Sequence, residues 1–502
     1  MRWDEVRWEW VLGGILIASF MVLVLQDFFF PGFQFIYRDY EDELLSLNWF
    51  AWLKGAAGCN YFGLCPLYHG NLNSYLMLPF FCVFGGSWTV IRLWPVAWAV
   101  GTILVGYFFI RKAFGRWEAM IFLFLCAVDP AFGIAVRVGN FHQSTTIFYS
   151  TACLLGFHRW WITKDARWLS FGVIMAGLGM MTRLWFIWFL AGLFVSAVVF
   201  FPWGMKWWGL PRVFKTIVWS ALPFVLISVV SEITMKTLFL FYENRDNTHQ
   251  IWEIVRWFND VVSGKYFMRY HFTSVVTNFQ TFIPHAFWIC FIAMGLWMVL
   301  ALVRGRRDIV GWMWFIIVTM FWCAWKSPRE LSHHFFFFYP LTFIVIAVMI
   351  GCSLRLLPFP RLRGFCGGAV CLLILLNAIP GWKEYRRQAD REGGVFLQLH
   401  EVVAGAPREY PLWVAMNGNL TLWNYAVVPC MDHQNVRIAL NQSQGVARWM
   451  MVVPLVNVQG NYDWAGYSEI IRQYDLKEMS RRDIVDESGR AFFRCVWLRR
   501  GI

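Results

Sequence analysis

Carboxylates are concentrated in one short segment of the chain, Tyr37–Glu43, which reads Tyr-Arg-Asp-Tyr-Glu-Asp-Glu. Clustered carboxylates raise one another's pKa and favour one protonated or metal-bound member. Such a group can act as the general base that deprotonates an acceptor hydroxyl or amine. The alternative is an acidic helix start that complements the macrodipole of an amphipathic helix at Leu44–Leu53.

A second acidic signal is Asp129, which precedes Pro130 near the end of the apolar run Glu118–Ala135. A charge near lipid is costly, so an aspartate at the end of a membrane span is functional more often than one in a loop. The alternative is that Asp129 and Pro130 only end the helix.

A third signal is a set of basic side chains at the ends of apolar runs. Arginine recognises phosphate through a fixed fork of donors, although basic residues at span ends also snorkel to lipid headgroups. Arg183 is the leading candidate because it lies between two apolar runs with no other charge beside it. The other candidate phosphate-binding residues are Arg92, His142, Lys326, Arg329, His333 and His334.

The composition indicates the environment in which these residues must be positioned. The chain has 502 residues and a net charge of +13, with 59% hydrophobic, 20% aromatic and 15% charged residues. Soluble domains are nearer to about 45–50% apolar and about 25% charged. The composition excludes a disordered chain, a coiled coil and a disulfide-dense mini-protein. It favours a membrane protein over a nucleic-acid-binding protein.

Eleven apolar runs predict a polytopic α-helical membrane protein. They are Trp10–Phe29, Trp88–Ile110, Glu118–Ala135, Thr145–Trp161, Trp168–Met181, Leu184–Trp203, Phe214–Phe241, Phe282–Val303, Ile309–Trp325, His334–Leu354 and Phe365–Ile379. The shorter run Leu72–Phe84 contains Asn73 and Pro79, so we predict that it forms an amphipathic helix at the membrane interface.

With Leu72–Phe84 at the interface, basic residues gather on one side of the membrane, as the positive-inside rule predicts for cytoplasmic loops. Five loops carry three basic residues each: Arg111/Lys112/Arg116, Arg159/Lys164/Arg167, Lys206/Arg212/Lys215, Arg304/Arg306/Arg307 and Arg355/Arg361/Arg363. With the N-terminus, this side has 17 basic and 6 acidic residues, so the positive charge records orientation. We therefore predict a multi-pass protein of the inner (cytoplasmic) membrane, with a cytoplasmic N-terminus and outer loops at 30–87 and 242–281.

Residues 381–502 differ from the predicted transmembrane domain, residues 1–380, in their higher charge density and shorter apolar runs. Predicted strands are Leu412–Met416, Val436–Leu440 and Trp449–Val453, with a helix at Ser468–Tyr474 and a hairpin over Asp483–Arg500. This pattern indicates a small α/β domain on the outer, periplasmic or extracellular, side.

Two cysteine pairs are candidate disulfides. Cys59 and Cys65 lie in the first predicted outer loop, where an oxidising compartment permits a bridge, and the alternative is two free thiols. Cys430 and Cys495 are the second candidate pair. No spacing of cysteine and histidine resembles a zinc site.

The order of these motifs over residues 10–380 resembles the GT-C superfamily of integral-membrane glycosyltransferases. It is most similar to the bacterial branch with protein O-mannosyltransferase-like and aminoarabinose transferase-like enzymes. The matching positions are Asp42-Glu43 in the acidic motif, Pro66-Leu67-Tyr68, Arg92, Gly115, Asp129-Pro130, Gly177–Arg183, and His333-His334 with Tyr339-Pro340.

The resemblance implies an inverting transferase that moves a sugar from a polyprenyl-phosphate carrier to a lipid, glycan or protein acceptor on the outer face of the membrane. Asp42 would be the base, followed by Asp39 or Glu43, and Asp129 would be a further catalytic carboxylate. The basic residues named above would hold the leaving phosphate, with Arg183 first. The resemblance implies no certain cofactor, although a divalent metal is compatible with it. Membrane lipids are expected partners, and nucleic acid is not an expected partner.

The chain departs from the family pattern at Asn140 and His142, in a region where many relatives have an acidic residue. A non-catalytic protein that binds lipid-linked glycan or scaffolds a membrane complex is therefore a second hypothesis. A transporter of lipid-linked glycan is a third, and it is disfavoured because the predicted spans are nearly free of charge.

Overall fold

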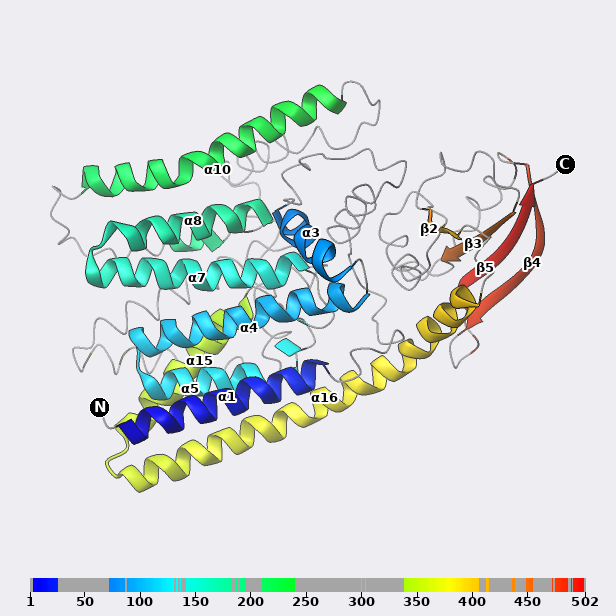
Figure 1. Ribbon diagram of the computed structural model, residues 1–502. Coiled ribbons are helices and arrows are strands. Elements are labelled where there is room, and N and C mark those ends of the chain that lie inside the picture. Colours follow the sequence, from blue (N-terminus) through cyan, green and yellow to red (C-terminus); the bar gives the residue numbers. More distant parts are fainter. Residues whose placement is uncertain are drawn as a thin grey trace, which may run out of the picture.

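The computed structural model describes residues 3–25, 72–85, 88–130, 132–133, 136, 141–182, 186, 189–194, 210–239, 299, 303, 338–405, 412–414, 436–437, 448–454, 472, 475–485, 489 and 491–500. Most of these residues form long helices that lie side by side, and β-strands lie beyond one end of the helices (Figure 1).

The helices follow the apolar pattern of the sequence. They are α1 Trp3–Leu25, α3 Leu72–Phe84, α4 Trp88–Ala113, α5 Arg116–Val128, α7 Phe141–Thr163, α8 Ala166–Thr182, α10 Leu210–Phe239, α15 Phe338–Leu356 and α16 Pro360–Ala404. The helix predicted at Leu72–Phe84 is confirmed with the same bounds, whereas its place at the membrane interface stays a prediction.

By length and composition, three of the described helices could cross a membrane, over Trp8–Leu25, Leu93–Ala113 and Pro360–Lys383. Residues 282–298 and 309–325 of the predicted spans lie outside the described residues. The number of eleven spans therefore stays a prediction. An unbroken helix over Glu118–Ala135 is wrong, because α5 ends at Val128 and the chain leaves helical geometry at Asp129.

Helix α5 packs against α1, α4 and α15. Beyond its end, the ring of Phe132 packs between Phe20 of α1 and Phe343 of α15, with centroids 5.7 and 6.0 Å away. All three rings are almost fully buried. These contacts hold the segment that follows α5 between α1 and α15.

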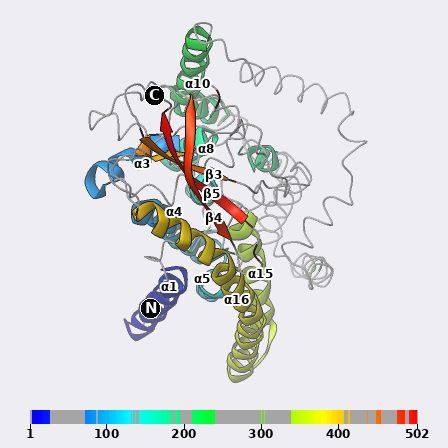
Figure 2. The ribbon, with the colours of Figure 1, turned by 90° about the vertical axis from the view of Figure 1, so that its right-hand side faces the viewer.

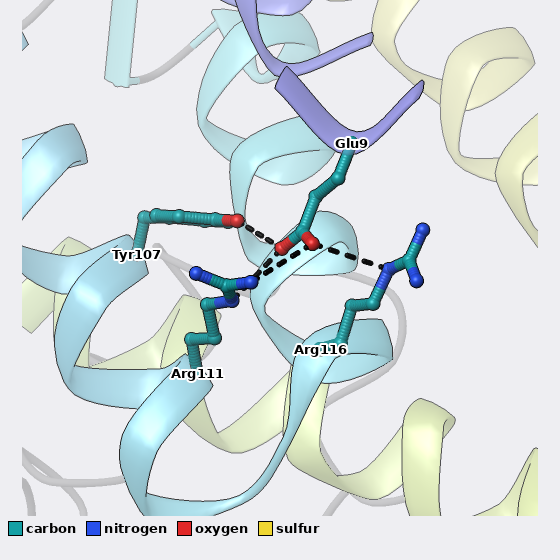
Figure 3. Close-up of polar contacts among 4 residues, drawn as sticks. All are labelled: Glu9, Tyr107, Arg111 and Arg116. Atoms are coloured by element: carbon teal, nitrogen blue, oxygen red, sulfur yellow. Dashed lines mark hydrogen bonds and ion pairs between the residues drawn. The ribbon is translucent and has the colours of Figure 1, made fainter. Parts of the chain in front are cut away.

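The N-terminal helix is tied to the turn between α4 and α5 by a buried carboxylate. Glu9 accepts hydrogen bonds from Tyr107 and from Arg111, whose Nη2 lies 3.1 Å from Oε2 (Figure 3). The Nε atoms of Arg111 and Arg116 lie 3.0 and 3.3 Å from the carboxylate oxygens. Arginine pairing and the tyrosine bond compensate for the loss of carboxylate hydration.

A second buried carboxylate, Glu118 of α5, forms an ion pair with Arg355 at the end of α15. Figure 1 shows the N-terminus and the α4–α5, α7–α8 and α15–α16 turns at the same end of the bundle, opposite the strands. Three of the five basic turns predicted to share one side of the membrane therefore lie together.

The strands form a mixed five-stranded sheet in the order β2-β1-β3-β5-β4. They are β1 Leu412–Val414, β2 Val436–Arg437, β3 Arg448–Pro454, β4 Leu476–Val485 and β5 Ala491–Arg500. β1 pairs in parallel with β2 and β3, whereas β5 is antiparallel to β3 and β4. Figure 2 shows the larger strands in front of the ends of the helices.

The predicted strands and the C-terminal hairpin are confirmed, but β4 begins at Leu476, earlier than predicted. Of the helix predicted at Ser468–Tyr474, only Arg472 is described. Cys495 is a buried free thiol in β5, so its predicted bridge to Cys430 is wrong. Burial raises the pKa of the Cys495 thiol to about 12.

Helix α16 connects the bundle to the sheet without a break at residue 380. It runs for 45 residues with Pro380 in its interior. Near its far end, Gln398 donates a hydrogen bond to the Val485 carbonyl of β4 at 3.1 Å. The boundary predicted between residues 380 and 381 thus falls inside one helix.

Candidate functional site

The ends of α4, α7 and α8 that face the sheet are joined by α3, which contacts all three helices (Figure 1). Arg92 lies in the first turns of α4, His142 is the second residue of α7, and Arg183 follows the last residue of α8. The fold therefore brings together the helix ends at or next to which Arg92, His142 and Arg183 lie in the sequence. This region, the α3 end of the bundle, is the candidate site.

A buried side-chain hydrogen bond fixes α3 on α4. The indole Nε1 of Trp94 donates to Oδ1 of Asn73 at 2.9 Å, and both side chains are almost fully buried. A buried amide that lost this partner would be costly, so the bond specifies how α3 meets α4. This bond explains why a polar residue, Asn73, lies in an otherwise apolar helix.

A series of aromatic contacts continues from α3 to α7. Trp94 packs against Phe80 of α3 at 4.8 Å and against Trp98 at 5.6 Å between ring centroids. Trp98 in turn contacts Phe148 of α7 at 4.9 Å. Edge-to-face packing of this kind favours a fixed arrangement of the helix ends.

Buried hydroxyl groups join α7 to α8 close to His142 and Arg183. The Oγ1 atoms of Thr146 and Thr182 lie 3.3 Å apart, and Thr182 also donates to the Gly179 carbonyl at 2.6 Å. Thr146 is four residues after His142, and Thr182 directly precedes Arg183. The contact thus places the backbone of α7 near His142 beside the end of α8.

The glycines of the stretch before Arg183 have a packing role. A Cβ atom on Gly179 would lie 2.5 Å from the Phe186 ring, and one on Gly177 would overlap the Phe224 ring of α10. Both aromatic side chains therefore approach the α8 backbone closely. The Gly-Leu-Gly sequence lets α8 sit against these two rings.

Asp129 caps the short helical turn that follows it. Its Oδ1 accepts a hydrogen bond from the Phe132 N–H at 2.8 Å, and Pro130 occupies the next position, where no N–H is needed. The indole of Trp382 on α16 covers this turn and donates to the Val128 carbonyl at 2.9 Å. The end of α5 at Val128 agrees with the structural interpretation, and Asp129 additionally caps the turn that follows.

The other predicted site residues lie in helical backbone or outside the described residues. The side chains of Arg92 and His142 are not described, although their backbones are helical. Asp39, Asp42, Glu43, Cys59, Cys65, Arg183, Lys326, Arg329, His333 and His334 lie outside the described residues. Within the described part, no three or more His, Cys, Asp and Glu side chains are grouped to hold a metal ion.

Three buried polar residues at this end, Asn73, Thr146 and Thr182, were not predicted as site residues. Their signal in the sequence is a polar side chain inside an apolar run, which does not distinguish a structural partner from a binding residue.

Residues 69–231 match the family model described as dolichyl-phosphate-mannose-protein mannosyltransferase. A search of curated protein sequences finds no significant match. The matched segment covers α3 to most of α10 and therefore includes the α3 end of the bundle.

The fold is similar over nearly the whole chain to ArnT from Cupriavidus metallidurans bound to undecaprenyl phosphate. The TM-score is 0.55 at 14% identity, covering 98% of each chain. The apo state of ArnT gives 0.54 at 14% identity, covering 99% of this chain and 98% of that chain. AglB from Archaeoglobus fulgidus, in complex with an inhibitory peptide and a dolichol-phosphate, gives 0.50 at 12% identity, covering 98% of this chain and 74% of that chain.

These similarities define the class at the level of fold: the chain has a helical fold similar to those of ArnT and AglB, and residues 69–231 match the mannosyltransferase family model. The resemblance seen in the order of the sequence motifs is confirmed at this level.

Proposed function

We propose that this protein is a membrane glycosyltransferase that takes a sugar from a polyprenyl-phosphate carrier. The observation that carries the proposal is the similarity in fold, over nearly the whole chain, to ArnT bound to undecaprenyl phosphate, together with the family match over residues 69–231. AglB, a second relative in fold, is in complex with a dolichol-phosphate. The acceptor would be a lipid, glycan or protein on the outer face of the membrane.

The reaction would be a direct displacement that inverts the anomeric carbon. Asp42, or else Asp39 or Glu43, takes a proton from the acceptor hydroxyl or amine, whose oxygen or nitrogen then bonds to the anomeric carbon. The bond from that carbon to the phosphate oxygen breaks, and the polyprenyl phosphate leaves with the electron pair. Asp129 ranks last as a base, because one of its oxygens already accepts the Phe132 N–H.

Basic residues would stabilise the negative charge that develops on the leaving phosphate. Arg183 is the first choice, because it follows the α8 end that α7 and α3 surround. Arg92 and His142 belong to the same helix ends, and Lys326, Arg329, His333 and His334 are further candidates. A divalent metal is compatible with the proposal and is not required by it.

The proposed setting is the inner membrane, with the N-terminus cytoplasmic and the sheet outside. Residues 381–502 would then form an extracytoplasmic α/β domain connected through α16 to the transmembrane domain of residues 1–380. A disulfide between Cys59 and Cys65 is proposed for the outer loop at 30–87.

The test is a transfer assay on purified protein with radiolabelled polyprenyl-phosphate sugars and crude membranes as acceptor. We expect Asp42→Asn to lower the rate about a hundredfold or more, since a general base contributes at least that factor. Asp39→Asn in parallel identifies which carboxylate is the base.

The matched control is Glu401→Gln, which removes an exposed carboxylate from α16 and should leave transfer unchanged. Thermal unfolding of each variant shows whether the fold is intact. Transfer by Asp42→Asn, Asp39→Asn and Glu43→Gln at the wild-type rate would contradict the assigned base. If the wild type transfers no sugar from any donor but binds the carrier tightly, the non-catalytic binding protein is the correct alternative.

A further inference from the structure

The β4–β5 hairpin is strongly basic. The two strands together have six basic and two acidic residues. β4 is the last strand of the sheet, and its residues from Lys477 to Asp483 are exposed or half-exposed. An exposed edge strand with this charge would repel a second strand of similar charge.

Both acidic residues of the two strands, Glu478 and Asp483, have cationic partners. Asp483 accepts two hydrogen bonds from Arg494, at 2.5 and 2.7 Å, and this arginine holds the pKa of the Asp483 carboxyl below its usual value. Glu478 lies 3.8 Å from Arg481. Among the described residues, Lys477 and Arg499 therefore have no acidic partner.

These two cations stand directly opposite each other in the sheet. Lys477 of β4 is paired in register with Arg499 of β5, and Arg499 is paired in register with Arg448 of β3. Residues directly opposite on neighbouring strands share one face with Cβ atoms about 5 Å apart, and like charges at such positions are destabilising. Lys477, Arg499 and Arg448 are here called the cation row. Placing like charges at these neighbouring positions destabilises the sheet.

The neighbouring positions on the same face are suited to a saccharide. Trp497, two residues before Arg499 on β5, is half-buried, and its register partner on β4 is the exposed Ser480. Alternate residues of a strand lie on one face, so an indole and a hydroxyl adjoin the cation row. An aromatic surface beside cations and hydroxyl groups can contact a sugar ring and its anionic substituents together.

The cation row lies at the end of β5 that is away from the helices. The C-terminus and the tip of β5 are at this end of the sheet, whereas the opposite end of β4 meets α16 (Figure 1). A membrane around the helices would not reach this edge. The position favours a ligand that extends from the membrane surface over a lipid headgroup in the bilayer.

We propose that the cation row, with Trp497 beside it, is a binding site for an anionic glycan, a saccharide chain that carries phosphate, sulfate or carboxylate groups. Lys477 and Arg499 supply charge-assisted hydrogen bonds to those groups, and the bound anions remove the repulsion between the opposed cations. The site does not depend on the proposed transferase activity, because binding is a property of the sheet.

The experiment titrates full-length protein in detergent with dextran sulfate and with neutral dextran of the same length, at low and high salt. We expect dextran sulfate to bind, with affinity that falls as salt increases, and neutral dextran not to bind. Arg499→Gln should weaken binding about tenfold, and Arg499→Lys should retain most of it.

The matched control is Arg481→Gln, which removes the same charge from the opposite face of β4, where Arg481 is near Glu478. Equal weakening by Arg481→Gln and Arg499→Gln would overturn the site in favour of a general charge effect. Absence of dextran sulfate binding would also overturn it, as would binding only to vesicles of phosphatidylglycerol. Because the proposed base is not part of the row, Asp42→Asn should bind dextran sulfate like the wild type even though its sugar transfer is slowed.

Discussion

At the scale of single residues, the Glu118 carboxylate is a buried charge that joins α5 to α15. Glu118 is fully buried at the start of α5, and its Oε1 also lies 3.8 Å from the Cys352 thiol, which donates to it. Arg355, the ion-pair partner, is about two-fifths exposed and donates to the Phe114 carbonyl at 2.8 Å. Gly351 of α15 leaves room for the carboxylate, since a Cβ there would lie 2.6 Å from it.

The two partners of this ion pair should therefore differ in their effect on stability. Arg355→Ala leaves a buried carboxylate without a cation and should destabilise the protein by on the order of 3 kcal/mol. Glu118→Gln should cost less, because a neutral amide is easier to bury and Arg355 can reach water. Thermal unfolding of the two variants in detergent tests the order, and a larger loss for Glu118→Gln would show that the carboxylate is not held as described.

At the scale of helices, α7 and α8 pack with their backbones in contact. A Cβ atom on Gly156 of α7 would lie 2.8 Å from the Cα and N atoms of Gly172 on α8. Small residues at facing positions let membrane helices approach closely. The same helix pair carries the Thr146–Thr182 contact at the candidate site, so its spacing affects both packing and the position of Arg183.

Gly156→Ala should therefore be destabilising although alanine favours helix. Backbone atoms of α8 cannot rotate away as a side chain can, so the two helices must separate, at a cost of about 1–3 kcal/mol. The control is Gly368→Ala in α16, where nothing lies within 4 Å of the added Cβ. That variant should be neutral or slightly stabilising. Equal unfolding midpoints for the two variants would contradict the close α7–α8 contact.

The helices were predictable where the apolar pattern has clear ends, and not where tertiary contacts override it. α3 was predicted with its observed bounds because polar residues precede it and Gly85 follows it. The continuation of α16 past Pro380 was missed because proline and the following glycine suggest an end. In the structure, Gly381 lies against Pro130, and the Trp382 indole bonds to the α5 end, so packing supports the helix there.

The candidate site was predictable only in part for a related reason. Sequence order placed Arg92, His142 and Arg183 at helix ends on one side, and the contacts of α3 bring those ends together. Asn73 and Thr182 were missed because one sequence does not reveal which buried polar groups meet. The first half of β4 was not predicted, because its charged sequence does not alternate between apolar and polar residues. The position of this strand is determined by its pairing with the apolar β5.

At the scale of the whole molecule, two ends of one bundle differ in charge and in what they contact. One end holds the basic turns and the ion pairs of Glu9 and Glu118, which join α1, α4, α5 and α15. The opposite end holds α3, the end of α5 and the sheet (Figure 1). Because basic loops tend to remain cytoplasmic during membrane insertion, this asymmetry predicts the direction in which the molecule crosses the membrane.

The orientation gives a prediction for reporter fusions at the two ends. The α7–α8 turn at Lys164 lies between Arg159 and Arg167, so green fluorescent protein fused there should fluoresce and alkaline phosphatase should be inactive. Fusions at Ile502 should behave in the opposite way, since the sheet lies at the other end of the bundle. Phosphatase activity at Lys164 with fluorescence at Ile502 would reverse the orientation, and the same reporter response at both sites would contradict the arrangement of the bundle. Under a reversed orientation, the α3 end would face the cytoplasm, and a sugar carrier on the outer leaflet could not reach it.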